Sequence, residues 1–286
     1  MIRNRATLIG FGAVILWAFL ATLTVGASEV PAFQLSAMCF AIGGTIGLLW
    51  IAFGGKGFAT LRGIKWSVWV LGIVGIFGYH FFYFTALKLA PPAEAGLIAY
   101  LWPLLIVLFS GFLPGERLRA LHIIGALVAF AGAALIVGGS PASFSGDNLW
   151  GYAAALVCAF TWSGYSVLSR LAGETPTESV AIFCLAAAGL SLLAHLGLEQ
   201  TVWPSGIIGW GSVIGLGLGP VGLAFYIWDV GVKRGDIQIL GVASYAAPML
   251  STVTLIIAGY ATASWILLLA AMLITSGAAI AAMANR

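Results

Sequence analysis

Residues 96–103 read Gly-Leu-Ile-Ala-Tyr-Leu-Trp-Pro, and residues 241–248 read Gly-Val-Ala-Ser-Tyr-Ala-Ala-Pro. Each stretch lies within an apolar segment, and in each the tyrosine precedes the proline by three residues. Proline has no amide hydrogen for the carbonyl four residues earlier, and its ring clashes with that carbonyl. Both stretches therefore predict an interrupted helix with a freed carbonyl, at Ala99 and at Ser244. We expect two matching hinges, formed by Gly96, Pro103, Gly241 and Pro248.

The two stretches lie 145 residues apart, and the same offset aligns the rest of the chain without a gap. Matches among scarce residue types carry most of the signal: Trp17 with Trp162, Glu29 with Glu174, Pro31 with Pro176, and Lys88 with Lys233. The sequence therefore predicts an internal duplication, with one unit at residues 7–139 and the second at residues 148–283.

The composition indicates a membrane protein. Of 286 residues, 62% are hydrophobic and 7% are charged, whereas about 25% of residues are charged in a soluble domain. A bilayer core of about 30 Å is crossed by about 20 apolar residues in a helix, and the unbroken apolar runs lack the alternation of barrel strands. We predict an all-α membrane protein with spans at residues 7–25, 31–53, 67–88, 93–113, 118–139, 148–170, 177–198, 207–231, 236–258 and 261–283.

Five spans in each unit is an odd number, so the second copy enters the membrane upside down. The duplication thus predicts two inverted five-helix repeats, an architecture of many secondary transporters. Cytoplasmic loops are rich in Lys and Arg. If the N-terminus is cytoplasmic, Lys88 is the only Lys or Arg that lies outside the cell membrane. Both termini are therefore predicted to be cytoplasmic. The inside residues are Arg3, Arg5, Lys56, Arg62, Lys65, Arg117, Arg119, Arg170, Lys233, Arg234 and Arg286.

Polar side chains deep in a span are functional candidates by default. His80 lies near the middle of the third span, with Tyr79 and Tyr83 on roughly the same helical face. We interpret this face as a cavity wall, although a neutral histidine hydrogen-bonded between helices would give the same pattern. Trp17 and Trp162 lie far from the interfaces where tryptophan usually anchors helices. Two interpretations stay open for them: their rings line a cavity, or they fill the core of the bundle. The predicted substrate-binding set is Trp17, Tyr79, His80, Tyr83, Tyr100, Trp102, Trp162, Tyr226 and Tyr245.

Other polar residues favour structural roles. Asp229 stands four residues before Lys233, a spacing typical of an ion pair, and Trp228 beside it extends the aromatic set. Glu94 opens the fourth span and His195 lies near the end of the seventh, where both are expected to face water. The cysteines fall in apolar runs and are expected to be buried thiols: Cys39, Cys158 and Cys184.

Several absences narrow the function. No Lys or Arg lies at mid-span, which argues against a phosphate-bearing solute. No phosphate-binding glycine loop is present, so ATP does not drive the chain directly, and no basic face for nucleic acid exists. An intramembrane enzyme would need a nucleophile near His80, and a scaffold would not need a broken helix in each half. We expect a transporter without catalytic residues, cofactor or metal.

The chain resembles the drug/metabolite transporter superfamily over essentially its whole length. The resemblance rests on ten spans in two halves, on Trp17-Ala18 in the first span, and on the stretch Leu-Ala-Pro-Pro-Ala-Glu-Ala at residues 89–95. Pro114-Gly115-Glu116, before the fifth span, is similar as well. Within the superfamily the chain looks like two tandem repeats of the EamA-type exporters.

Particular motifs resemble most closely the branch of bacterial aromatic amino acid exporters. These are Tyr79-His80, Tyr100-x-Trp102-Pro103 and Trp162. The second half departs from the pattern, because Ala261 aligns with Glu116 and Phe225 aligns with His80. The two halves therefore cannot be equivalent, and His80 has no counterpart.

The resemblance implies export of amino acids and related metabolites across a bacterial inner membrane, through a central cavity with alternating access. Our interpretation is an exporter of aromatic and other neutral amino acids. The spans lack a central carboxylate, which favours uniport, while the imidazole of His80 leaves proton coupling open. The alternative is export of another small amphipathic metabolite or drug. The expected partners are a small-molecule substrate and the lipid bilayer, and a monomer would suffice.

Overall fold

The computed structural model describes residues 2–54, 57–137 and 145–284. Over these residues the regular structure is entirely helical, and ten helices are long and apolar enough to cross a membrane. They occupy residues 3–26, 32–53, 66–89, 92–110, 120–137, 146–171, 179–198, 206–234, 237–257 and 265–283, which confirms the ten predicted spans. Lys56, Arg286 and the last two positions of the predicted fifth span, 138–139, lie outside the described residues.

Several spans consist of two helices in line. The α-helices are α1 (Ile2–Trp17), α2 (Leu20–Gly26), α3 (Ala32–Phe53), α4 (Trp66–Ile73), α5 (Tyr79–Leu89), α6 (Pro92–Ala99), α7 (Trp102–Ser110), α8 (Ala120–Val137), α9 (Leu149–Leu171), α10 (Ser179–Leu198), α11 (Gly206–Leu218), α12 (Ala224–Arg234), α13 (Ile237–Ala243), α14 (Ala246–Ile257) and α15 (Trp265–Met283). Two π turns, η2 (Val74–Gly78) and η4 (Gly219–Leu223), continue α4 into α5 and α11 into α12. The 3-10 turn η1 (Phe58–Leu61) lies in a connection, and the 3-10 turn η3 (Gly146–Asn148) begins the sixth span.

The fourth and ninth spans break at the two predicted positions, between α6 and α7 and between α13 and α14. Pro103 and Pro248 are buried in the first turn of the following helix, where an amide hydrogen has no helical partner. One detail of the prediction is wrong. The Ser244 carbonyl is not free, because the Ala247 amide donates to it at 3.0 Å in a tighter three-residue turn.

The third and eighth spans carry a second pair of irregularities, the π turns η2 and η4. They begin at Val74 and Gly219, which are separated by the 145-residue offset of the duplication. π turns within helices are rare and occur frequently at functional sites. η2 directly precedes Tyr79 and His80, so it sets the direction in which α5 presents these side chains.

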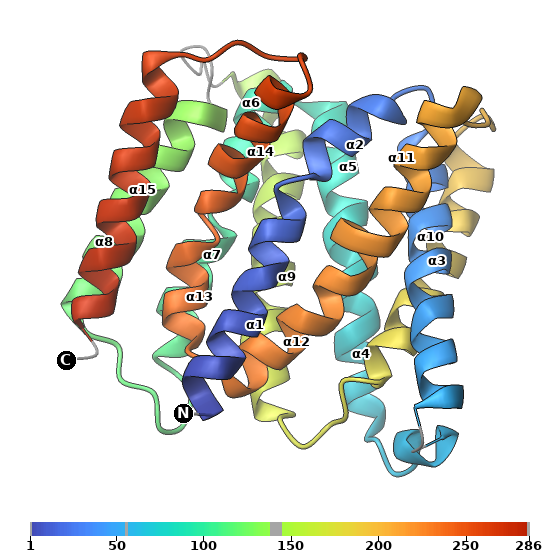
Figure 1. The fold of residues 1–286 in the computed structure, drawn as a ribbon, viewed down its shortest axis with the longest axis horizontal. Coiled ribbons are helices and arrows are strands. Elements are labelled where there is room, and N and C mark those ends of the chain that lie inside the picture. Colours follow the sequence, from blue (N-terminus) through green and yellow to red (C-terminus); the bar gives the residue numbers. More distant parts are fainter. Residues whose placement is uncertain (1, 55–56, 138–144, 285–286) are drawn as a thin grey trace.

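The two halves of the chain interlock. The most extensively packed pairs are α8 with α15, α3 with α10, α1 with α12, and α5 with α9, and each pair takes one helix from each half (Figure 1). Glycine permits the closest approach: a Cβ added to Gly10 would lie 2.8 Å from the Cα of Gly231. Helix α1 begins and α15 ends at the same end of the bundle, the lower end in Figure 1. It is termed the terminal end below, and the opposite end is the far end.

Candidate functional site

Four tryptophans from four spans meet in the core of the bundle. Trp17 comes from α1, Trp102 from α7, Trp162 from α9 and Trp228 from α12, and the ring centroids of all six pairs lie between 5.1 and 6.3 Å apart. Trp17 is half-buried and the other three are buried. Contacts at this spacing stabilise aromatic groups beyond simple burial. These residues are termed the tryptophan cluster.

The four indole N–H groups of the cluster fall into two kinds. Trp17 donates to the Pro220 carbonyl at 3.2 Å, and Trp228 donates to the Ser166 hydroxyl at 3.1 Å. Within the described residues, the indole N–H groups of Trp102 and Trp162 have no protein partner, yet neither nitrogen is sealed from solvent. Buried donors normally find an acceptor in the protein or in ordered water, so these two donors are available to water or to a bound molecule.

Three side chains of α5 extend the cluster. The Tyr79 ring lies 5.3 Å from Trp162 and stacks parallel to Tyr83 at 6.1 Å, and His80 lies 5.1 Å from Tyr79. All three side chains are half-buried. Both tyrosine hydroxyls lack partners in the part of the chain that the structure describes, without being sealed from solvent. Because α5 runs toward the far end, these side chains lie on the far-end side of the site, with Tyr83 one turn beyond Tyr79.

The structure does not bring every member of the predicted substrate set to the cluster. Tyr226 donates to the Gly43 carbonyl of α3 at 2.9 Å, on the side of α12 away from Trp228. Tyr245 is fully buried in a separate group, where its hydroxyl accepts the Leu104 amide at 3.0 Å. Tyr100 is half-buried and packs against that second group.

Phe225 is a neighbour of the cluster that the sequence did not identify. Its ring lies 5.6 Å from Trp162 and 6.1 Å from His80, the residue with which it aligns in the duplication. The same alignment could have indicated that Tyr226 faces α3. Its counterpart Phe81 packs against Phe33 of α3 at 5.7 Å, so both residues of this aligned pair face α3.

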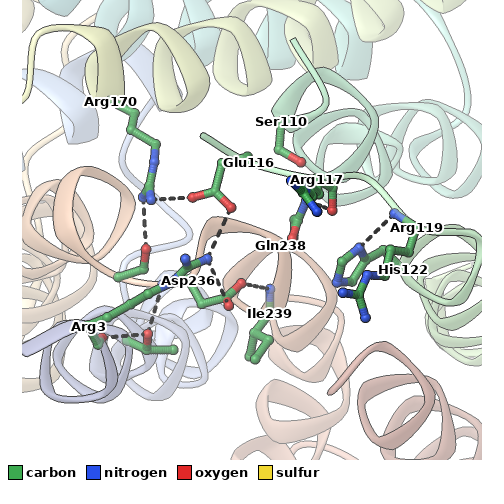
Figure 2. A network of polar contacts seen from close by, with 12 residues as sticks. Arg3, Ser110, Glu116, Arg117, Arg119, His122, Arg170, Asp236, Gln238 and Ile239 are labelled. Carbon is green, nitrogen blue, oxygen red and sulfur yellow. Dashed lines mark hydrogen bonds and ion pairs between the residues drawn. The ribbon is translucent and has the colours of Figure 1, made fainter. Parts of the chain in front are cut away.

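Charged side chains join four segments at the terminal end (Figure 2). Arg3 of α1 contacts Asp236, in the turn before α13, at 3.0 Å and Glu116, in the connection after α7, at 3.1 Å. Arg170, in the last turn of α9, donates to Glu116 and to two backbone carbonyls at the end of α12, at 2.9 and 2.8 Å. This terminal charge network was not predicted, because the sequence showed these residues only as topology and family markers.

Predictions for the other ionisable residues had mixed outcomes. The Asp229–Lys233 ion pair is confirmed, with Nζ and Oδ1 2.8 Å apart. The prediction that Glu94 and His195 face water is wrong, because they are 5% and 2% exposed. Glu94 accepts a hydrogen bond from the Tyr152 hydroxyl, so the neighbouring span covers the helix start that the sequence left open. The three cysteines are free and buried, as predicted.

Two pockets lie at the ends of the bundle. A pocket of about 500 Å³ at the terminal end is lined by Leu113, Pro114, Arg170, Leu171, Gly173, Glu174, Lys233 and Arg234. A pocket of about 340 Å³ at the far end is lined by Gly26, Ser28, Glu29 and residues 205–209. Neither includes a residue of the predicted substrate set, and the larger one lies beside the terminal charge network.

A bundle of ten spanning helices whose core holds unpaired polar and aromatic groups has the architecture of a membrane transporter. The chain belongs to the EamA-like transporter family, which matches residues 4–138 and again residues 149–283. This finding confirms the resemblance to EamA-type exporters.

Individual relatives match over long stretches. The chain is 55% identical to the aromatic amino acid exporter YddG of Ancylobacter novellus over the full length of both. It is 27% identical to the aromatic amino acid exporter YddG of Escherichia coli over 88% of each chain. It is also 28% identical to the pseudopaline exporter CntI of Pseudomonas aeruginosa, over 69% of this chain and 66% of that protein. A crystal structure at 55% identity superimposes with a TM-score of 0.94 over 99% of both chains.

The family and the ten spanning helices define the setting of the protein. It is a multi-pass protein of the bacterial inner membrane that carries a small molecule, and it is not an enzyme.

Proposed function

We propose that the protein exports amino acids, aromatic and other neutral ones among them, across the inner membrane. The observation that carries the proposal is a group of polar atoms beside the tryptophan cluster that have no hydrogen-bond partner among the described residues: the hydroxyls of Tyr79 and Tyr83, Nε2 of His80, and the indole N–H groups of Trp102 and Trp162. Aromatic faces suit the side chain of the substrate, while the polar atoms suit its ammonium and carboxylate, which need partners once dehydrated. Relatives named aromatic amino acid exporters support the same substrate class.

In the proposed topology, residues 7–139 and 148–283 are inverted repeats with both termini in the cytoplasm. The equal spacing of the π turns and of the helix breaks supports the repeat, as does the pairing of helices across the two halves. The terminal end is then the cytoplasmic end, and the terminal charge network closes it. The half-buried faces of Tyr79 and Tyr83 lie on the periplasmic side, as in a transporter open to the outside.

Transport then proceeds by alternating access. The helix breaks at Pro103 and Pro248, with Gly96 and Gly241 about two turns before them, let half of each span move while the other half stays packed. Separation of Glu116 from Arg170 opens the cytoplasmic end. Among the described residues no carboxylate makes a hydrogen bond or ring contact with the cluster, which favours uniport over proton antiport.

Counterflow into proteoliposomes tests the proposal. Purified protein in vesicles loaded with unlabelled tryptophan or phenylalanine should concentrate the labelled amino acid, and a pH gradient should leave the rate unchanged. His80→Ala should reduce counterflow at least about ten-fold, because a hydrogen bond to a charged group is lost. His195→Gln, a histidine change remote from the cluster, is the matched control and should retain it. Full counterflow by His80→Ala would contradict the proposed site.

A second candidate is export of another amphipathic metabolite through the same site. The relative named pseudopaline exporter supports a broader range of cargo within the family. A panel of unlabelled competitors separates the two. Inhibition by aliphatic amino acids and drugs equal to that by tryptophan would favour the second candidate.

A further inference from the structure

The hydrogen bond of His80 fixes the chemistry that its ring offers. Nδ1 lies 2.8 Å from the Ile76 carbonyl oxygen, within the π turn that precedes α5. A carbonyl oxygen only accepts, so Nδ1 carries a hydrogen. In the neutral imidazole the other nitrogen, Nε2, then holds a lone pair and has no hydrogen to donate.

The surroundings of His80 provide no hydrogen-bond donor to Nε2 among the described residues, so this atom can bind a ligand. Four rings flank the imidazole, with centroids at 4.9 Å for Phe40, 5.1 Å for Tyr79, 6.0 Å for Phe84 and 6.1 Å for Phe225. Within the described residues Nε2 has no hydrogen-bond partner, yet it is not sealed from solvent. Among the described residues, no carboxylate makes a hydrogen bond or ring contact with the imidazole. Holding a charged imidazole away from water without such a partner would cost free energy. Neutral His80 is therefore an acceptor without a protein donor among the described residues.

The donors belong to the tryptophan cluster, which two of these rings also contact. Tyr79 and Phe225 each contact both His80 and Trp162, at centroid distances of 5.1 to 6.1 Å. The unpaired indole N–H groups of Trp162 and Trp102 can only donate. The site thus has a polarity, with an obligate acceptor at His80 and obligate donors at the two tryptophans.

We infer that His80 is a specificity-determining residue whose Nε2 accepts a hydrogen bond from the ammonium group of the substrate. The indole N–H groups of Trp102 and Trp162 donate to its carboxylate. This inference rests on the proposed function and adds the orientation of the amino acid. The faces of Phe40 and Tyr79 beside the imidazole complement the cationic head, since aromatic faces attract ammonium groups. The substrate class is accordingly a primary or secondary amine that carries an apolar group, and an acid without an amine is excluded.

Substrate analogues that each lack one head group test this orientation. Tryptamine has the ammonium without the carboxylate, and indole-3-propionate has the carboxylate without the ammonium. In competition with tryptophan counterflow, tryptamine should inhibit at least about ten-fold more strongly than indole-3-propionate, the effect of a hydrogen bond to a charged group. His80→Phe keeps a ring of similar shape without the lone pair and should reduce the preference to about two-fold or less, whereas His80→Gln, whose amide oxygen can accept, should retain most of it.

A spectroscopic measurement decides the tautomer without transport. The chain has three histidines, so nitrogen NMR of the protein in nanodiscs, with His80→Phe to assign the signal, resolves the two ring nitrogens of His80. A protonated Nδ1 and an unprotonated Nε2 near pH 7.5 are expected, and an imidazolium or the opposite tautomer would overturn the inference. Equal or stronger inhibition by indole-3-propionate would also overturn it. Absence of any amino-acid counterflow would instead refute the proposed function, with the NMR result still deciding the role of Nε2.

Discussion

Replacement of Glu116 by Gln should shift the protein toward a state that is open at the terminal end. Glu116 is 6% exposed and pairs with Arg3, which is 47% exposed, and with Arg170, which is 18% exposed. Exposed ion pairs contribute roughly 0.2–1 kcal/mol, whereas removing one partner of a buried pair costs about 3–5 kcal/mol. Arg170 keeps two carbonyl acceptors, so we expect a loss of about 2 kcal/mol, or about 30-fold in the open population.

Labelling of a single cysteine next to Arg170 of the terminal charge network measures that population. Ser169 is 4% exposed and precedes Arg170 on α9. In a background with the three buried cysteines changed to alanine, Ser169→Cys should react with a membrane-impermeant maleimide only when this end opens. The labelling rate should rise about 30-fold in Glu116→Gln. The matched control is Glu174→Gln, which changes an exposed carboxylate that lines the pocket at the terminal end. It should leave the labelling rate within about two-fold.

The labelling result has a clear contrary outcome. An unchanged rate in Glu116→Gln, with an unchanged melting temperature, would refute the view that the network holds the terminal end closed. An unchanged rate with a lower melting temperature would make the network a contributor to overall stability only. Restoration of slow labelling by Glu116→Asp would support the charge itself as the cause.

Three further predictions concern individual contacts. Asp229→Asn leaves the buried Lys233 charge without its partner and should cost about 3 kcal/mol in thermal unfolding, while adding Lys233→Met should recover most of the loss. Gly10→Ala forces the α1–α12 contact apart and should lower the melting temperature by several degrees, whereas Gly211→Ala, whose added Cβ meets nothing within 4 Å, should leave it unchanged or higher. Tyr100→Phe removes a hydroxyl without a protein partner in the described structure, so counterflow kinetics should change while stability stays within about 0.5 kcal/mol.

The spans and their breaks could be predicted because each depends on local properties. Length and hydropathy decide which segments can cross a bilayer, and a proline breaks a helix through atoms of its own neighbourhood. The sequence could not predict how each break is repaired. At Ser244 the chain tightens into a three-residue turn, a choice that depends on packing around the break.

Side-chain direction was harder to predict, because a span that is apolar on all faces offers no contrast between buried and exposed sides. Trp228 and Tyr226 are two positions apart and point to opposite sides of α12, one to the cluster and the other to α3. Both are aromatic, so residue type did not separate them. The duplication carried a signal for Tyr226, because it aligns with Phe81 and both residues contact α3.

Long-range charge pairing had no local signature at all. Arg3 contacts residues 113 and 233 positions away, and each residue alone reads as an ordinary loop charge. The family motif Pro114-Gly115-Glu116 marked one member without indicating its partners. Only the packing of α1, α9 and α13 at one end of the bundle brings Arg3, Glu116, Arg170 and Asp236 together (Figure 2).

The four members of the terminal charge network have no charged counterparts in the duplication, and this asymmetry bears on the transport cycle. The positions that align with its four members carry Asn148, Ala261, Val25 and Pro91, none of them charged. If the two halves exchange their arrangements during transport, the network can form in one state only. Without substrate, the network then favours the state that is closed at the terminal end. In such a cycle, substrate that binds from the terminal end must offset this preference, so substrate binding and the separation of Glu116 from Arg170 would be thermodynamically coupled.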